Sequence, residues 1–201
     1  MKHAVAAGLA TGLAMMIGGA LGAVSNLDPR PVPDADPEVM NPIIDGQAML
    51  PDRDIMENMS ASPMHTTLVH DLKETGVAAA LKTNGQFTVF APTDAAFREA
   101  GAQSGAALAR HMSYLIVPGK YDSTALLRLI SEAGGQAKMR TAEGGVLVAM
   151  LNGPTNIMVM DERGNSADIA IYDVRDKNGI VHVVDRVLEP SSPPREIASN
   201  R

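Results

Sequence analysis

The stretch TVFAPTDAAF, residues 88–97, joins an apolar, strand-like run to a helix-like run. Between the two runs, Pro92 lacks a backbone donor and ends a strand, and Thr93 is a favourable helix N-cap. Asp94 falls in the first helical turn, where the helix dipole favours negative charge. A hydrolase nucleophile elbow has the same shape but requires Gly-x-Ser-x-Gly, and alanines stand two residues either side of Thr93. We therefore interpret Thr93 and Asp94 as structural residues of a strand–corner–helix joint.

Helix-period patterns dominate the chain before residue 135. A short helix is predicted in RDIMENM, and two more in SPMHTTLVHDLKETGVAAALKTNG, separated at Gly76. The segment GAALARHMSYLIVPGKY predicts a helix, a strand over Tyr114–Val117 and a Pro-Gly turn. The segment STALLRLISEAGG predicts an amphipathic helix capped by Ser123 or Thr124.

Beyond residue 135 the period changes to two, which predicts strands. Two hairpins are expected, with turns at residues 143–145 and 162–165. The dipeptide Asn178-Gly179 predicts a third tight turn, before a strand that ends at Pro190. The segment DERGNSAD is interpreted as a hairpin turn because it lacks the spacing of a calcium loop. Helices first and strands later predict an α+β domain.

Two segments resemble the signatures of the fasciclin (FAS1) domain: TVFAPTDAAF resembles the first and NGIVHVVDRVLEP the second. Between them, YLIVPGKY is similar to the Tyr-His segment of that family, with Leu115 in place of the usual His. The resemblance covers about Gln47 to Pro190 and is closest to the bacterial, single-domain branch. It implies two β-sheets packed in a wedge with helices along one edge. It also implies a secreted or surface module for adhesion or matrix contact, without catalytic activity.

The same resemblance indicates where a partner would bind. In animal members of the family, the strand surface at the Tyr-His segment has been implicated in receptor contact, and an Asp-Ile dipeptide is used for adhesion. The corresponding residues in this chain are Tyr114, Leu115 and Ile116 in the first segment, and Asp173 and Val174 in the second. We expect this strand, with its Pro-Gly turn, and Asp173-Val174 to form the adhesive surface; Leu115 and Ile116 point to opposite faces, and if Leu115 is the outward one, Leu115→Asp should abolish partner binding.

The N-terminus predicts export. A positive start, MKH, precedes an uncharged run from Ala4 to Val24 with small residues at its end, which is typical of a secretory signal over residues 1–23. The alternative is an uncleaved membrane anchor. Residues 24–46 are rich in Pro and Asp and are expected to form an acidic spacer. The domain is expected over residues 47–190, with a tail at 191–201. The protein is accordingly placed outside the cytoplasm, whether secreted, periplasmic or on the cell surface.

Composition excludes several classes of function. The chain has no Cys, so disulfides and thiol chemistry are absent. Without a basic stripe, nucleic-acid binding is not expected, and no nucleotide-binding or zinc-protease motif occurs. We expect no cofactor, no metal and no enzymatic activity. His182, inside an apolar strand pattern, is interpreted as a buried structural residue. The partner is expected to be a protein or a matrix or envelope component.

One alternative function is left open by the sequence. Thioethers and imidazoles bind Cu(I) in exported proteins, and such side chains gather in one segment. An extracytoplasmic protein that binds copper or another small ligand is therefore the second hypothesis. The 13 methionines equally suit a core that is poor in aromatic residues. The residues concerned are Met56, Met59, Met64, His65 and His70.

Overall fold

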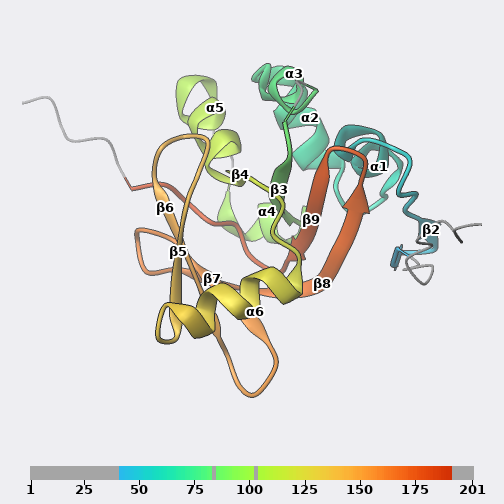
Figure 1. Cartoon of the computed structure of the whole chain (residues 1–201). Coiled ribbons are helices and arrows are strands. Elements are labelled where there is room, and N and C mark those ends of the chain that lie inside the picture. Colours follow the sequence, from blue (N-terminus) through green and yellow to red (C-terminus); the bar gives the residue numbers. More distant parts are fainter. Residues whose placement is uncertain (1–40, 83–84, 102–103, 192–201) are drawn as a thin grey trace, which may run out of the picture. The chain divides into compact units, whose positions relative to one another are not determined.

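Helices occupy most of the first half of the described chain and strands most of the second, which confirms the predicted α+β class. The computed structural model describes residues 41–82, 85–101 and 104–191; the predicted signal, residues 24–40 of the predicted spacer and residues 192–201 lie outside these ranges. The helices are α1 (Ile55–Ala61), α2 (Thr66–Glu74), α3 (Val77–Leu81), α4 (Asp94–Ala100), α5 (Gly105–Tyr114) and α6 (Ser123–Glu132) (Figure 1). The strands are β1 (Ile43–Ile44), β2 (Gln47–Ala48), β3 (Phe87–Pro92), β4 (Ile116–Pro118), β5 (Gln136–Arg140), β6 (Val146–Leu151), β7 (Ile157–Met160), β8 (Ser166–Asp176) and β9 (Gly179–Val184).

Seven strands form one mixed sheet in the order β4-β3-β9-β8-β7-β6-β5. Strands β3 and β9 pair in parallel, and the other neighbours pair antiparallel. The 11-residue strand β8 joins two halves, because Ser166–Asp168 pair with β7 whereas Ile169–Asp176 pair with β9. In Figure 1, β8 and β9 run side by side at the right, and β5, β6 and β7 lie at the left. The two sheets implied by the resemblance are thus continuous through β8.

The outer strands of this sheet are tied to each other. The Ala142 amide, just after β5, donates to the Ile116 carbonyl in β4 at 2.7 Å. Tyr114 is fully buried, and its hydroxyl donates to the Val146 carbonyl at 2.8 Å and accepts from the Glu162 amide at 3.2 Å. Tyr114 therefore fastens the turns of both predicted hairpins to the end of α5.

The predicted corner is confirmed. Pro92 is the last residue of β3, and Thr93 has extended backbone angles and caps α4. Its hydroxyl accepts from the Ala96 amide at 3.3 Å. The helix then runs from Asp94 to Ala100. Local sequence preferences are sufficient to explain this joint.

The Asn178-Gly179 turn, also confirmed, is a contact point for several elements. The Asn178 side chain accepts from the Ile55 amide at 2.9 Å and donates to the Leu81 carbonyl at 2.6 Å, so that it joins the start of α1 to the end of α3. A Cβ atom on Gly179 would lie only 2.0 Å from the Phe87 carbonyl oxygen. Glycine is therefore required at this position for β9 to approach β3.

Four boundaries differ from the predicted ones. Residues 41–46 belong to the fold rather than to a spacer, because Ile44 in β1 is fully buried and Asn41 forms two hydrogen bonds with the Arg175 backbone. Tyr114 ends a helix instead of starting a strand. The cap of α6 is Asp122, whose carboxylate accepts from the Ala125 amide at 2.8 Å. The last strand ends at Val184, six residues before Pro190.

The helices cover different parts of the sheet. Helix α6 packs against β5 and β6, whereas α1 contacts β9 and α4 contacts β3. Helix α2 lies among the others and contacts α1, α3, α4 and α5. No helix of the described ranges is long and apolar enough to cross a bilayer.

Candidate functional site

The strand surface predicted to bind a partner is buried. Tyr114 and Leu115 are fully buried, and Ile116 and Val117 are almost so. Leu115 is the C-cap of α5, and its carbonyl accepts from the Phe90 amide at 3.0 Å, so this apolar run lies between helix and sheet. Neither Leu115 nor Ile116 therefore faces solvent, so neither offers an outward apolar side chain to a partner. In this segment the residues exposed to solvent begin at Pro118.

The second predicted contact, Asp173-Val174, has a structural role in this domain. Val174 is fully buried, and Asp173 has a φ of 56° at an irregularity of β8. The Asp173 carboxylate accepts from the Ser123 amide at 2.7 Å and from the Ser123 hydroxyl at 2.5 Å. It therefore holds the start of α6 against β8. The sequence gives no sign of this contact, because the two residues are 50 positions apart.

His182 is buried and hydrogen bonded, as predicted. Its Nε2 donates to the Tyr121 carbonyl at 2.8 Å, and its Nδ1 accepts from the Asp173 amide at 3.3 Å. The ring stacks on Phe90 with a centroid distance of 5.7 Å. Burial lowers the pKa of His182, although the Tyr121 carbonyl and the Asp173 charge favour the protonated form. Both ring nitrogens are thus occupied by the protein itself.

Asp94 does more than its position in the first turn of α4 suggests. Its carboxylate accepts from the Thr66 amide and hydroxyl, at 3.2 and 2.7 Å, and from the Thr67 amide at 2.8 Å. It thereby caps α2, whose own N-cap residue, His65, supplies no side-chain hydrogen bond to the helix. Partial burial favours the neutral acid, but the hydrogen bonds from Thr67 and Thr66 outweigh it and lower the pKa of Asp94.

The Met- and His-rich segment does not form one cluster of soft ligands. Met56, Met59 and His65 are buried in the core, and Met64 packs against it, whereas His70 is exposed. His65 Nδ1 shares a hydrogen bond with the Ser62 hydroxyl at 2.7 Å. This arrangement favours the role of core filler for the methionines. A thioether copper site would require the core to open.

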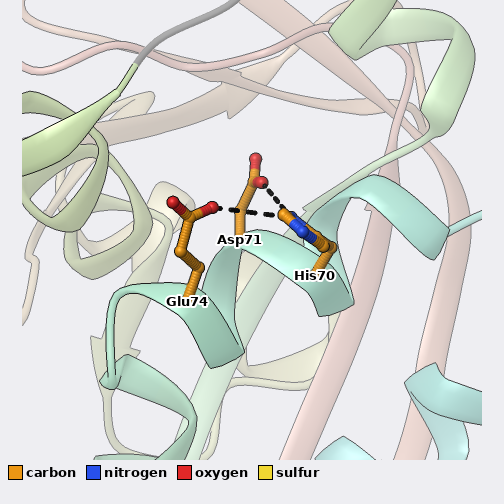
Figure 2. A group of neighbouring side chains, drawn as sticks. All are labelled: His70, Asp71 and Glu74. Atoms are coloured by element: carbon orange, nitrogen blue, oxygen red, sulfur yellow. Dashed lines mark hydrogen bonds and ion pairs between the residues drawn. The ribbon is translucent and has the colours of Figure 1, made fainter.

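His70 instead lies with two carboxylates on α2 (Figure 2). Its Nδ1 is 3.1 Å from Asp71 Oδ1 and 3.6 Å from Glu74 Oε2. Ligand atoms about 3.0–3.4 Å apart would suit a cation with bonds of about 2.1 Å, such as Zn²⁺. However, a hydrogen bond from Nδ1–H explains the same spacing, and His70 and Glu74 are largely exposed to solvent. The group offers three nitrogen and oxygen donors from one helical turn.

A pocket of about 320 Å³ opens among α2, α4 and α5. Two of its lining residues, Leu108 and His111, are buried, and Phe97 packs partly against the core. His111 donates from Nε2 to the Leu188 carbonyl at 2.9 Å, and its buried Nδ1 has no hydrogen-bond partner. Sequence reasoning did not single out these residues. We call this site the helical pocket; its lining residues are Thr67, Asp71, Phe97, Arg98, Gly101, Leu108 and His111.

The two signature segments, far apart in the sequence, lie side by side in the sheet as the parallel neighbours β3 and β9. The sequence profile of the Fasciclin domain matches residues 63–190. The chain belongs to the Fasciclin domain family. Domains of this family are generally non-enzymatic and extracellular, and are related to adhesion.

Two cyanobacterial proteins are similar to this Fasciclin domain protein, both from Synechocystis sp. (strain ATCC 27184 / PCC 6803 / Kazusa). The first, Protein sll1483, is 29% identical over 147 residues, which are 68% of this chain and 73% of that protein. The second, Uncharacterized protein sll1735, is 28% identical over 141 residues, which are 67% of this chain and 96% of that protein.

A solved structure confirms the fold. It is the FAS1 domain pair from the insect cell adhesion molecule fasciclin I, with a TM-score of 0.58 and 18% identity. The match covers 71% of this chain and 52% of that one, so the chain spans about half the length of the domain pair.

Proposed function

We propose that this Fasciclin domain protein is a non-enzymatic binding module outside the cytoplasm that makes adhesive or matrix contacts. The proposal is supported by one observation: the polar residues of the family signatures and of the Asp173 segment form hydrogen bonds within the domain. Asp94 caps α2, Asp173 holds the start of α6 through Ser123, and both nitrogens of His182 are hydrogen bonded within the domain. A catalytic residue has to contact a substrate, but these groups are already bonded to the protein. We therefore assign partner contact to other residues, on the exposed surface.

The contact surface we favour is an apolar patch on the β1–β2 hairpin. Ile43 pairs with Ala48 across the two strands, so their side chains share one face. Leu50 follows two residues after Ala48. Ile43 is 65% exposed and Leu50 is 37% exposed. We call these three residues the hairpin patch. Full burial of an Ile or Leu side chain contributes about 1.5–3 kcal/mol. Burial of Ile43 and Leu50 against a partner would therefore favour binding.

The N-terminal segment before the domain has a separate role in this proposal. Residues 1–23 direct export, and the Pro- and Asp-rich residues from 24 to about 40 act as an acidic spacer. The spacer is shorter than the sequence alone predicts, because residues 41–46 belong to the fold. Its negative charge favours solvation over contact with anionic lipid. Mass spectrometry of the extracytoplasmic fraction would detect the processed chain; a full-length, membrane-embedded species would favour the anchor instead.

The contact proposal is tested with the mature chain, starting at Val24, on isolated envelope fragments. We expect saturable attachment that falls at least about tenfold in the variant Ile43→Asp/Leu50→Asp. Leu127→Asp on α6 is the matched control, because Leu127 is 39% exposed and lies outside the patch. Equal attachment of both variants would exclude the hairpin patch. Absence of saturable attachment for the wild-type chain would contradict the adhesive function itself.

A further inference from the structure

The helical pocket carries two opposite charges on different helices. Asp71 lines it from α2 and Arg98 lines it from α4. Within the described chain, the Arg98 side chain forms no hydrogen bond or ion pair, while the Asp71 carboxylate is contacted only by the exposed His70. Phe97 and Leu108 add apolar surface to the same pocket. One cationic group, one anionic group and an apolar wall are therefore available together.

His111 adds a buried acceptor. Because its Nε2 donates a proton to the Leu188 carbonyl, the neutral ring carries a lone pair on Nδ1. Nδ1 is buried without a hydrogen-bond partner, and His111 is only 2% exposed. Burial lowers the pKa of His111, which keeps the ring neutral near pH 7, although the Leu188 hydrogen bond and the charges of Glu189 and Asp71 oppose this shift. The neutral ring therefore lines the pocket without adding a positive charge that would repel a cationic group of a ligand.

Size narrows the class of ligand. The pocket volume of about 320 Å³ lies at the lower end of the range for small-molecule sites. A cavity of roughly 150 Å³ holds one benzene ring. The helical pocket therefore has room for one apolar group and a short polar head.

We infer that the helical pocket binds an α-amino acid with an apolar side chain. The carboxylate pairs with the Arg98 guanidinium, and the ammonium group donates to the Asp71 carboxylate. The apolar side chain packs against Phe97 and Leu108. This function is independent of the hairpin patch, which lies on β1 and β2.

The probe is L-phenylalanine, titrated into the mature protein by calorimetry with a chelator present. Two comparison ligands remove one charge each: 3-phenylpropionate lacks the ammonium group, and phenethylamine lacks the carboxylate. We expect saturable binding of L-phenylalanine and at least about tenfold weaker binding of both comparison ligands, because each loses a charged hydrogen bond. Equal binding of 3-phenylpropionate, or no binding of L-phenylalanine at millimolar concentration, would overturn the inference.

Variants locate the site. Arg98→Gln and Asp71→Asn should each weaken binding of L-phenylalanine about tenfold, since each removes one charged partner. Arg128→Gln is the matched control, because Arg128 is an exposed arginine on α6, outside the pocket. These are polar substitutions at positions outside the core, so thermal unfolding midpoints should stay close to that of the wild type. Unchanged affinity in both pocket variants would place the ligand elsewhere and contradict the assignment.

Discussion

The Asp94 carboxylate, in the first turn of α4, caps the neighbouring helix α2 by accepting a 2.8 Å hydrogen bond from the Thr67 amide. Two further bonds from Thr66 reach the same carboxylate. Two adjacent residues of the first signature thus cap two different helices: Thr93 caps α4, and Asp94 caps α2. The corner that ends β3 is a joint for the helical layer as well as for the sheet.

Substitutions at this joint should separate its two caps. Thr93→Ala removes the cap of α4 and should lower the free energy of unfolding by about 1 kcal/mol. Asp94→Ala instead leaves three donors at the start of α2 without their acceptor. It should lower the free energy of unfolding by about 2 kcal/mol, because hydrogen bonds to charged groups are stronger. Urea denaturation of both variants measures the difference. Equal losses would mean that the contacts with Thr66 and Thr67 add nothing to stability.

His182→Leu should destabilise the domain by roughly 2–4 kcal/mol. Leucine fills a similar volume but leaves the Tyr121 carbonyl and the Asp173 amide without partners, and each buried unsatisfied group costs about 1–3 kcal/mol. His70→Leu is the control, because His70 is exposed and its contacts are on the surface. Chemical denaturation measures the unfolding midpoint of each variant. An unfolding midpoint that is the same in both variants would contradict the structural role of His182.

Local turn and cap chemistry was predictable from the sequence, whereas contacts over long separations were not. The corner at Thr93 and the turn at Asn178-Gly179 follow from preferences of adjacent residues. The Asp94 cap joins residues 28 apart and the contact of Asp173 with Ser123 joins residues 50 apart, and neither has a required spacing. The helical pocket draws on three helices and leaves no periodic signal for the same reason.

The burial of both Leu115 and Ile116 could not be predicted from the sequence, for a specific physical reason. The run from Tyr114 to Val117 is apolar throughout, so alternation cannot indicate which side chain of a strand would face solvent. In the fold the run crosses from the end of α5 into β4, and all four residues are buried. A continuous apolar run is typical of a segment that is buried on both sides.

Leu115→Asp should therefore unfold the domain instead of removing partner binding alone. A fully buried leucine is replaced by a charge that has no partner, which costs more than the several kcal/mol of a typical core truncation. Pro118→Asp, three residues away at an exposed position, serves as the control. Far-ultraviolet circular dichroism measures the folded fraction. A folded Leu115→Asp variant would show that this segment is less tightly packed than its burial implies.

Tyr114→Phe tests how the hairpin turns are held. The substitution keeps the ring but removes the hydroxyl that donates to Val146 and accepts from Glu162. We expect a loss of about 1–2 kcal/mol, since two backbone groups lose their partner in partly buried hydrogen bonds. Hydrogen exchange should become faster at the Glu162 amide. Unchanged exchange there, with unchanged stability, would contradict the fastening role. Tyr172→Phe provides the comparison, because its hydroxyl contacts the β6–β7 region.

Buried histidines should make the domain less stable in mild acid. Burial lowers the pKa of His65 from 6.5 to about 4, and it also lowers the pKa values of His111 and His182. Below pH 6.5 the unfolded chain then binds more protons than the native one, so the free energy of unfolding falls as the pH drops towards 4. His65 alone accounts for about 3 kcal/mol of this change. In His65→Gln the decrease between pH 7.5 and 4.5 should be smaller by that amount; an identical decrease would contradict the prediction.

Asp176 should change stability in the opposite direction. It is 5% exposed, accepts one hydrogen bond from the Asn58 amide group, and has a second carboxylate oxygen without a partner. Burial raises the pKa of Asp176 from 3.8 to about 7, although the Asn58 bond opposes the rise. The native state therefore holds a proton that the unfolded chain has released, and this contribution is present below pH 3.8 and lost as the pH rises through 7.

The variant Asp176→Asn isolates this effect. It keeps an acceptor for Asn58 but cannot become charged, so its stability relative to wild type should be greater at pH 8 than at pH 4 by about 4 kcal/mol. Any pH-independent cost of the new amide group cancels in this comparison, as do the contributions of the three histidines. Urea denaturation of both proteins at the two pH values gives the four free energies required. A stability difference that is the same at pH 4 and pH 8 would mean that Asp176 titrates as an ordinary aspartate, and that solvent reaches its second oxygen.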